Sequence, residues 1–379
     1  MSFLLDGFRA VTWQQCVMYL VGAALIYLAI QKDYEPALLL PMGFGAILVN
    51  LPSSGVLNQM VEGIGESQGI IQWLFETTIE ASEALPLLLF IGIGAMIDFG
   101  PLLSNPKMLL FGAAAQFGIF FTMVAAVLLG FDLADAASIG IIGAADGPTS
   151  ILVSQVLRSK YVGPIAVAAY SYMALVPIIQ PFAIKLVTTK KERRIRMPYN
   201  PRNVSHTLRI CFPVLVTVIA GFIAPMSVSL VGFLMFGNLL RECGCLDRLS
   251  ETAQNVLANL ITLLLGITIS FSMRAEEFVK FDTLLIMGLG LVAFVFDSVA
   301  GVMFAKLLNL FSRNKVNPMV GAAGISAFPM SARVIQKMGL EADPQNHLLM
   351  HAVGANVAGQ IASVLAGGMI LNLVPQLLK

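Results

Sequence analysis

One carboxylate stands where apolar sequence normally excludes charge. Asp146 is the only charged residue of the run GAADGPTS, residues 143–150, which lies between long apolar stretches. A carboxylate near the centre of a bilayer costs about 2.5–3.5 kcal/mol on insertion scales, so its retention points to a function. The glycines and the proline break a helix and free backbone carbonyls, which are tolerated at membrane depth only where they are buried or line a cavity. Carboxylate, hydroxyl and carbonyl oxygens suit a hard cation, so the run predicts a cation site at Asp146.

A second run of the same kind occurs late in the chain. It reads NPMVGAAGISAFPMSAR and extends from Asn317 to Arg333, with Gly321 and Ser326 inside it. We expect it to break a helix like the first run and to supply Asn317 and Ser326 from the opposite side of the cation site. The alternative is that its small residues serve only close helix packing.

Three further polar residues lie in apolar segments. Tyr170 and Tyr172 follow the first run, and Asp297 stands in the apolar stretch 282–309. A tyrosine hydroxyl can bind an ion or relay a proton, or it can belong to an interfacial aromatic belt. For Asp297 two alternatives remain open, which are an ion pair with Lys306 and a place in the ion path.

The composition requires a membrane to hold these residues. Apolar residues make up 57% of the 379 residues and charged residues only 12%, the formal net charge is +1, and the mean hydropathy is +0.83. A soluble fold cannot bury so much apolar surface, and a net charge near zero gives no basic excess for binding nucleic acid. Repeated apolar stretches broken by glycine and proline favour helices over a β-barrel. The fold class is therefore an all-α polytopic membrane protein.

The two halves of the chain look related. The run Leu87-Leu88-Leu89 recurs 176 residues later at Leu263, and the Gly-Ala-Ala of residue 143 recurs 178 residues later at residue 321. Two matches at nearly the same spacing predict an internal duplication, which is common in transporters. If residues 209–240 form one element, each repeat has five spans and one extra helix precedes them. We therefore expect about eleven transmembrane helices, with two inverted repeats.

The densest basic segment lies between the repeats. Eight lysines and arginines fall between residues 185 and 209, and this places the segment in the cytoplasm. With eleven spans, the N-terminus is then expected inside and the C-terminus outside. The predicted organisation is an N-terminal extra helix (1–35), a first inverted repeat (36–188), a basic cytoplasmic linker (189–208) and a second inverted repeat (209–379).

The two runs together carry a family resemblance over nearly the whole chain. Ala-Ala-Asp-Gly-Pro-Thr over residues 144–149, and Asn317-Pro-x-x-Gly321 with Ser326 and Arg333, resemble the β subunit of the sodium-transporting carboxylic acid decarboxylases. Oxaloacetate, methylmalonyl-CoA and glutaconyl-CoA decarboxylases belong to that family. The resemblance implies an elevator-type fold in which two broken helices cross at the midplane of a mobile core.

The resemblance also implies an activity that several subunits share. A carboxyltransferase α subunit would load biotin on a carrier subunit, and this chain would decarboxylate the carboxybiotin with proton uptake and pump sodium ions outward. The chain has no Ala-Met-Lys-Met biotinylation motif, so biotin would come from the carrier. A small membrane γ/δ subunit and a homotrimer of β subunits are implied as well, in the cytoplasmic membrane of a bacterium or archaeon.

The family motif assigns roles by position. Asp146 would bind sodium and exchange a proton, and Asn317 and Gly321 would share its site. Tyr172 and Ser326 would form a second sodium site, with the tyrosine relaying a proton. Arg333 would meet the carboxybiotin, because a guanidinium holds a carboxylate with a forked pair of hydrogen bonds.

Two rival functions and one refinement follow from the same sequence. A stand-alone sodium-coupled secondary transporter, for sodium and protons or an organic anion, would need no partner subunit. A purely structural membrane anchor would gain nothing from a costly intramembrane carboxylate. The chain is short for an oxaloacetate member, and this favours a glutaconyl-CoA or methylmalonyl-CoA system.

Overall fold

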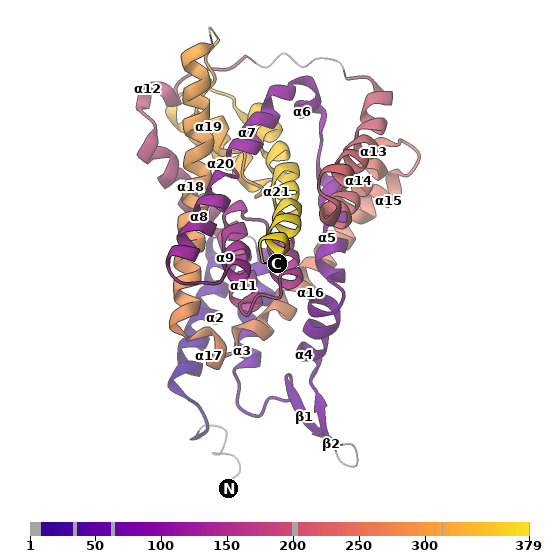
Figure 1. Cartoon of the computed structure of the whole chain (residues 1–379), viewed down its shortest axis with the longest axis vertical. Helices are drawn as coiled ribbons and strands as arrows, with labels where there is room; N and C mark the ends of the chain where they lie inside the picture. Colours follow the sequence, from indigo (N-terminus) through magenta and orange to yellow (C-terminus); the bar gives the residue numbers. More distant parts are fainter. Residues whose placement is uncertain (1–8, 33–35, 62–64, 199–203, 313, 379) are drawn as a thin grey trace.

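Helices make up most of the described part of the chain (Figure 1). The computed structural model describes residues 9–32, 36–61, 65–198, 204–312 and 314–378. Within these ranges, seven helices are long and apolar enough to cross a membrane, or eight if one pair bent by 67° forms a single span. These helices confirm an all-α polytopic membrane protein, while the count of eleven stays a prediction.

Among the described residues, the first half consists of ten α-helices joined by short turns and one hairpin. The hairpin pairs β1 (Asn58–Val61) antiparallel with β2 (Gly65–Gln68). The α-helices are α2 (Trp13–Lys32), α3 (Pro36–Val49), α4 (Ile70–Phe75), α5 (Ala84–Met96), α6 (Gly100–Ser104), α7 (Leu109–Ala114), α8 (Phe117–Leu128), α9 (Leu133–Gly140), α10 (Gly147–Val156) and α11 (Val162–Val187). Tighter or wider turns continue some of them, namely η1 (Glu76–Glu80), η2 (Pro106–Met108) and η3 (Ile141–Ala144).

The second half follows a short helix, α12 (Lys190–Arg193), in the basic linker. Its α-helices are α13 (His206–Ile223), α14 (Val228–Glu242), α15 (Asp247–Glu251), α16 (Ala258–Ile269), α17 (Ala275–Phe278), α18 (Phe281–Phe311), α19 (Met319–Ala322), α20 (Met330–Ala342) and α21 (Leu349–Leu377). The turns η4 (Pro225–Ser227), η5 (Thr252–Leu257) and η6 (Ser270–Met273) lie between them.

Residues 209–240, which the sequence allowed to be one long broken helix or two short ones, form two helices. The 3-10 turn at Pro225 separates α13 from α14, because proline cannot continue the hydrogen-bond ladder of a helix. The helices α13 and α14 then pack against each other, as α2 and α3 do. In addition, α5 packs on α14 while α16 packs on α3. Such reciprocal packing is expected from two related halves, and the repeat boundaries themselves stay predictions.

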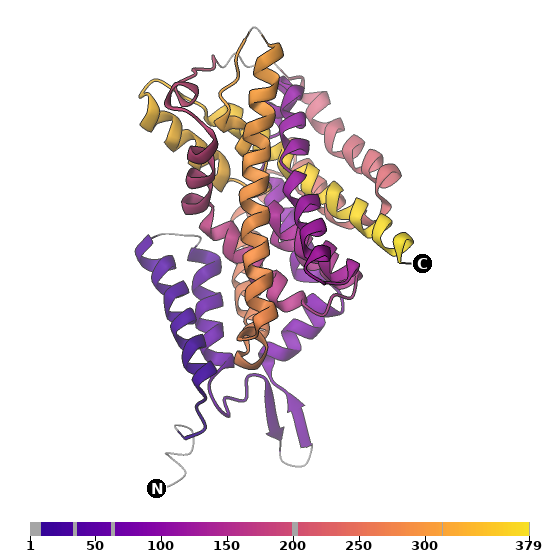
Figure 2. The same ribbon diagram turned by 60° about the vertical axis from the view of Figure 1, so that its left-hand side comes forward.

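The molecule has two distinct ends along its long axis. The end that carries α12 and α6 is called the basic end, and the end that carries the β1–β2 hairpin and α17 is called the hairpin end (Figures 1 and 2). Helix α2 begins at the hairpin end. The first eight residues lie outside the described ranges, so the expectation that the N-terminus shares a membrane side with the basic linker stays a prediction. Helix α9 with η3 has twelve residues and α10 has ten, so neither is long enough to span a bilayer alone.

The core is centred on α21. In its most apolar window, 72% of the residues are buried, against 17% for α2 and 11% for α13. Small residues permit this enclosure: a Cβ added to Gly359 would lie 2.1 Å from the carbonyl oxygen of Gly324. Helix α21 therefore lies directly against the second broken segment.

Candidate functional site

Asp146 stands at the break between η3 and α10. It is the N-cap residue of α10, where its side chain accepts the amide of Thr149. The preceding Ala145 has a φ of 52°, a left-handed conformation that is strained for a residue with a Cβ. The amide of Ser326 donates to the carbonyl oxygen of Ala144 at 3.0 Å. The breaks in the two sequence runs thus touch, as the sequence predicts.

Four side chains converge on the Asp146 carboxylate. Its Oδ2 accepts the hydroxyls of Thr149 and Ser363, both at 2.8 Å, and the hydroxyl of Ser326 at 3.1 Å. The amide of Gln360 reaches the same oxygen at 3.4 Å. The carboxylate is only 4% exposed. Residues from α10, the α19–α20 connection and α21 therefore meet at one carboxylate.

This arrangement leaves the negative charge of Asp146 without a cation. None of the ion pairs formed among the described residues includes Asp146. A buried carboxylate without a counter-charge is costly, and hydrogen bonds offset only part of that cost. Binding a proton or a cation would neutralise it. The hydroxyl and amide oxygens around it are the hard ligands that suit a small cation.

Ser326 and Tyr172, expected together at a second site, bond to different partners in this structure. Ser326 bonds to Asp146, whereas the hydroxyl of Tyr172 donates to the carbonyl oxygen of Met287 in α18. Tyr170 is the tyrosine beside Asp146: its ring packs on Gly147, where an added Cβ would lie 2.3 Å from the ring Cζ.

Asn317 and Gly321 likewise contact residues other than Asp146. The Asn317 side-chain amide donates to the carbonyl oxygens of Arg193 at 3.0 Å and Ile195 at 2.8 Å. It therefore fastens the basic linker to the second broken segment. Gly321 packs on Gly301 of α18, where an added Cβ would lie 2.0 Å from the Gly301 carbonyl oxygen.

Arg333 lies on α20 and is exposed. With Gln336, Lys337, Leu340 and Glu341 it lines a cavity of about 550 Å³. Arg333 has no ion-pair partner in the part of the chain that the structure describes. Its guanidinium is therefore available to a carboxylate that enters this cavity.

Asp297 does not pair with Lys306, so that alternative is wrong. Lys306 pairs with Glu192 of α12 at 3.0 Å. Asp297 is fully buried, and its Oδ1 accepts the amide of Gly118 in α8. Its Oδ2 lies against Gly143 in the turn before Asp146. Asp297 therefore packs from α18 against the first broken segment.

Several residues of the site were not identified from the sequence. Gln360 and Ser363 on α21 were not selected, although two polar residues three apart in a strongly apolar helix share one face. Thr149 was noted only as part of the run. Gln180 was also missed: its amide donates to the Ala322 carbonyl oxygen at 2.8 Å and so supports the second broken segment.

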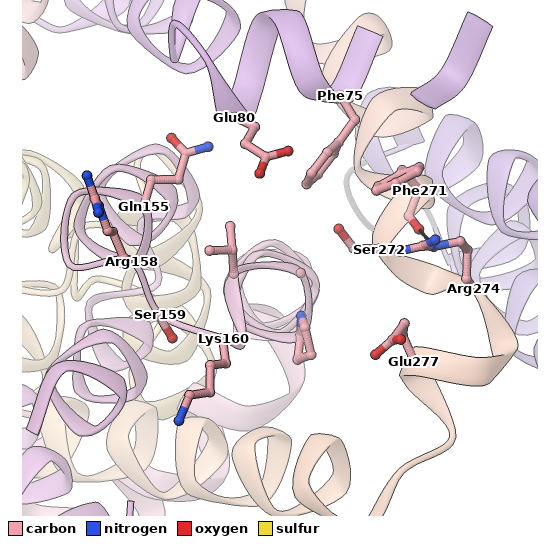
Figure 3. A pocket seen from close by; sticks show the side chains of 13 residues that line it. Phe75, Glu80, Gln155, Arg158, Ser159, Lys160, Phe271, Ser272, Arg274 and Glu277 are labelled. Carbon is pink, nitrogen blue, oxygen red and sulfur yellow. Dashed lines mark hydrogen bonds between the residues drawn. The ribbon is translucent and has the colours of Figure 1, made fainter. Parts of the chain in front are cut away.

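A separate charged cavity of about 570 Å³ opens between the α10–α11 turn and the helices η1, η6 and α17 (Figure 3). Arg158 and Lys160 lie on the turn, and Glu80, Arg274 and Glu277 lie on the other walls. It contains none of the site residues predicted from the sequence.

The fold and the site define a class of protein: a polytopic membrane protein whose two broken helical segments surround a buried carboxylate suited to a cation. A sequence profile described as "Na+-transporting oxaloacetate decarboxylase beta subunit" matches residues 14–374. The chain belongs to this family of decarboxylase β subunits, as the two sequence runs indicate.

Individual relatives agree over almost their full lengths. The chain is 48% identical to the glutaconyl-CoA decarboxylase subunit beta of Acidaminococcus fermentans and to the methylmalonyl-CoA decarboxylase subunit beta of Propionigenium modestum, covering 97% of this chain and 96% of each relative. It is 45% identical to the probable oxaloacetate decarboxylase beta chain of Vibrio cholerae, over 97% of both. The acyl-CoA relatives are thus slightly more similar, and none of these relatives is named as a stand-alone transporter.

Proposed function

We propose that this chain is the membrane β subunit of a biotin-dependent decarboxylase, which decarboxylates carboxybiotin and couples that reaction to outward sodium transport. The observation that carries the proposal is the buried Asp146 carboxylate, which accepts hydrogen bonds from four side chains and the Thr149 amide and forms no ion pair with any described residue. Family membership and the slightly higher identity to acyl-CoA relatives support a glutaconyl-CoA or methylmalonyl-CoA system.

The reaction consumes one proton for each carboxyl group lost. When bound, carboxybiotin supplies a carboxyl group on nitrogen; its N–C bond breaks, carbon dioxide leaves and the nitrogen takes up a proton. Arg333 would orient the carboxylate from the exposed face of α20. Tyr172 would relay a proton, and this role follows from the family motif alone.

Asp146 would bind either a sodium ion or a proton. Because its carboxylate is buried, the two compete for one negative charge. Ser326 would be a ligand of the same ion in the arrangement seen here. Asn317 and Gly321, which the family motif places at a sodium site, would reach one only after the second broken segment moves relative to the linker.

Alternating access would expose Asp146 to one side at a time. In the proposed elevator, the two broken segments slide as a core against the outer helices. The cavity beside Arg333 opens at α20, and the charged cavity of Figure 3 opens beside the α10–α11 turn. Moving one sodium ion costs about 2.3 kcal/mol for each 100 mV of membrane potential, and the irreversible loss of carbon dioxide can drive it.

The proposal includes an assembly. A carboxyltransferase α subunit, a biotin carrier subunit and a small γ/δ membrane subunit would accompany this chain, which would form a homotrimer in the cytoplasmic membrane of a bacterium or archaeon. The name β subunit in the relatives supports a complex of several subunits.

Sodium uptake tests the proposal. Inverted vesicles that contain the assembled complex are given the acyl-CoA substrate as the only energy source, and radioactive sodium uptake is measured with and without avidin. We expect uptake that avidin abolishes, because avidin sequesters biotin. Uptake that ignores avidin and follows an imposed proton or anion gradient would instead make this chain a secondary transporter.

A further inference from the structure

A second cavity at the basic end has the chemistry of an anion site. It measures about 290 Å³ and lies between the end of α11, α12 and α20. Four cationic residues and one carboxylate line it, together with Met338 and Ala342: they are Lys185, Lys190, Arg193, Arg194 and Glu341. The excess of positive charge favours an anion.

The arginines of this basic pocket are held in place, and the lysines are free to bind. Arg193 donates from Nη1 to the Thr188 carbonyl oxygen at 2.8 Å, and Arg194 donates from Nε to the Ala342 carbonyl oxygen at 3.1 Å. Lys185 and Lys190 are exposed and form no ion pair within the described ranges. The two arginines are therefore fixed by hydrogen bonds, whereas the ammonium groups of Lys185 and Lys190 remain available to bind an anion.

The linker behind the pocket is also fixed. Arg196 donates to Asp343 from Nε at 2.6 Å and from Nη2 at 3.0 Å, and Asn346 donates to the Arg193 carbonyl oxygen at 3.0 Å. The hydrogen bond from Arg196 lowers the pKa of Asp343 below its ordinary value, so this carboxylate is ionised and already paired. It does not compete for the lysines of the pocket.

The end of α18 next to the pocket is apolar and exposed. Lys306 of α18 pairs with Glu192 of α12, which fixes the level of the linker on that helix. Beyond this pair, α18 continues for more than another turn with Leu310 and Phe311, which are 78% and 84% exposed. Exposed apolar residues at the end of a membrane-spanning helix indicate that the apolar layer extends at least to the level of α12.

An apolar stripe descends α11 directly from the pocket. Ile178, Phe182 and Leu186 are 48%, 60% and 64% exposed and are spaced four residues apart, so they share one helix face. Leu186 is adjacent in sequence to Lys185. A cationic pocket above an outward-facing apolar stripe matches a headgroup above its acyl chains.

We propose that this basic pocket binds the phosphate headgroup of an anionic membrane lipid, with its acyl chains lying along Ile178, Phe182 and Leu186. The excess of positive charge assigns the basic end to the cytoplasmic side, and the leaflet on that side is the one rich in anionic lipid. Basic pockets between membrane helices bind such headgroups. Each lysine or arginine near the surface strengthens the binding of anionic lipid by about fivefold.

The test compares two double variants of the full chain. Phosphatidylglycerol is titrated into the purified protein in phosphatidylcholine nanodiscs, and the bound anionic lipid is counted by native mass spectrometry. Lys185→Gln with Lys190→Gln should weaken phosphatidylglycerol binding roughly thirtyfold, from two lysine–lipid interactions. The control, Lys107→Gln with Lys315→Gln, removes two exposed lysines that do not line the pocket and should leave binding within about threefold.

Three outcomes would overturn the proposal. Equal loss of lipid in both double variants would show nonspecific charge attraction. Displacement of the lipid by inorganic phosphate alone would make the pocket a site for soluble phosphate. Unchanged lipid binding combined with weaker association of a partner subunit, or with a changed oligomeric state, would make this surface a protein interface. Thermal unfolding in phosphatidylcholine alone verifies that both variants are folded.

Discussion

Replacing Asp146 by asparagine removes the charge that the proposed sodium site requires while keeping the shape of the side chain. Two unit charges about 4 Å apart interact by about 4 kcal/mol at an effective dielectric constant of about 20. Loss of that interaction weakens sodium binding about a thousandfold. The asparagine Oδ1 can still accept the hydroxyls of Ser363 and Thr149, which lie 2.8 Å from the native Oδ2. The fold should therefore persist while sodium binding fails.

The assay is the sodium dependence of decarboxylation by the assembled complex, with sodium uptake into vesicles as the second readout. We expect Asp146→Asn to lose sodium-stimulated turnover at every accessible sodium concentration. Asp247→Asn, the same change at an exposed position on α15, should behave like the unchanged protein. If Asp146→Asn keeps a half-saturating sodium concentration within about threefold of the unchanged protein, the buried carboxylate is not the sodium ligand.

Three smaller perturbations test the same site. Ser363→Ala removes a hydroxyl oxygen that would ligate the sodium ion, a contact to a charged group worth about 1.5–3 kcal/mol, and should raise the half-saturating sodium concentration about tenfold or more. No change in that concentration would exclude Ser363 from the site. Gly147→Ala would place a Cβ 2.3 Å from the Tyr170 ring and should lower the thermal unfolding temperature. Adding Tyr170→Leu should restore part of that temperature. If Gly147→Ala alone unfolds at the same temperature as the unchanged protein, this packing is contradicted. Arg333→Gln should slow turnover with the biotin carrier by about tenfold or more without changing sodium affinity. Lys337→Gln in the same cavity should slow turnover less. If both variants lose turnover equally, the cavity acts through its net charge and not through the Arg333 guanidinium.

The sequence revealed the centre of the site because membrane insertion makes polar residues expensive. Asp146 and the two broken runs violate the apolar pattern strongly, and the structure brings Asp146 and Ser326 into contact. Gln360 and Ser363 violate it less, because amides and hydroxyls also serve helix packing in membranes. Their role becomes visible only when α21 is placed against α10.

The roles of Asn317 and Tyr172 could not be placed from the sequence, because side-chain partners depend on the relative positions of helices. Asn317 holds the linker through Arg193 and Ile195, and Tyr172 bonds to α18. Pro225 is a similar case: a proline can kink one helix or separate two, and only packing shows that α13 and α14 are separate.

The hydrogen bonds around Asp146 explain how one site could couple sodium to motion. The hydroxyls of Ser326 and Ser363 now donate their protons to the carboxylate. A sodium ion beside Asp146 would take a lone pair of those hydroxyl oxygens, so the hydroxyls must reorient when the occupant changes. Because these residues belong to the second broken segment and to α21, whereas Asp146 belongs to the first broken segment, a change of occupant changes the bonds between three elements. A ligand shifts a conformational equilibrium only through such a difference in contacts, and here the difference lies at the junction of the two broken segments that the proposed elevator must move together.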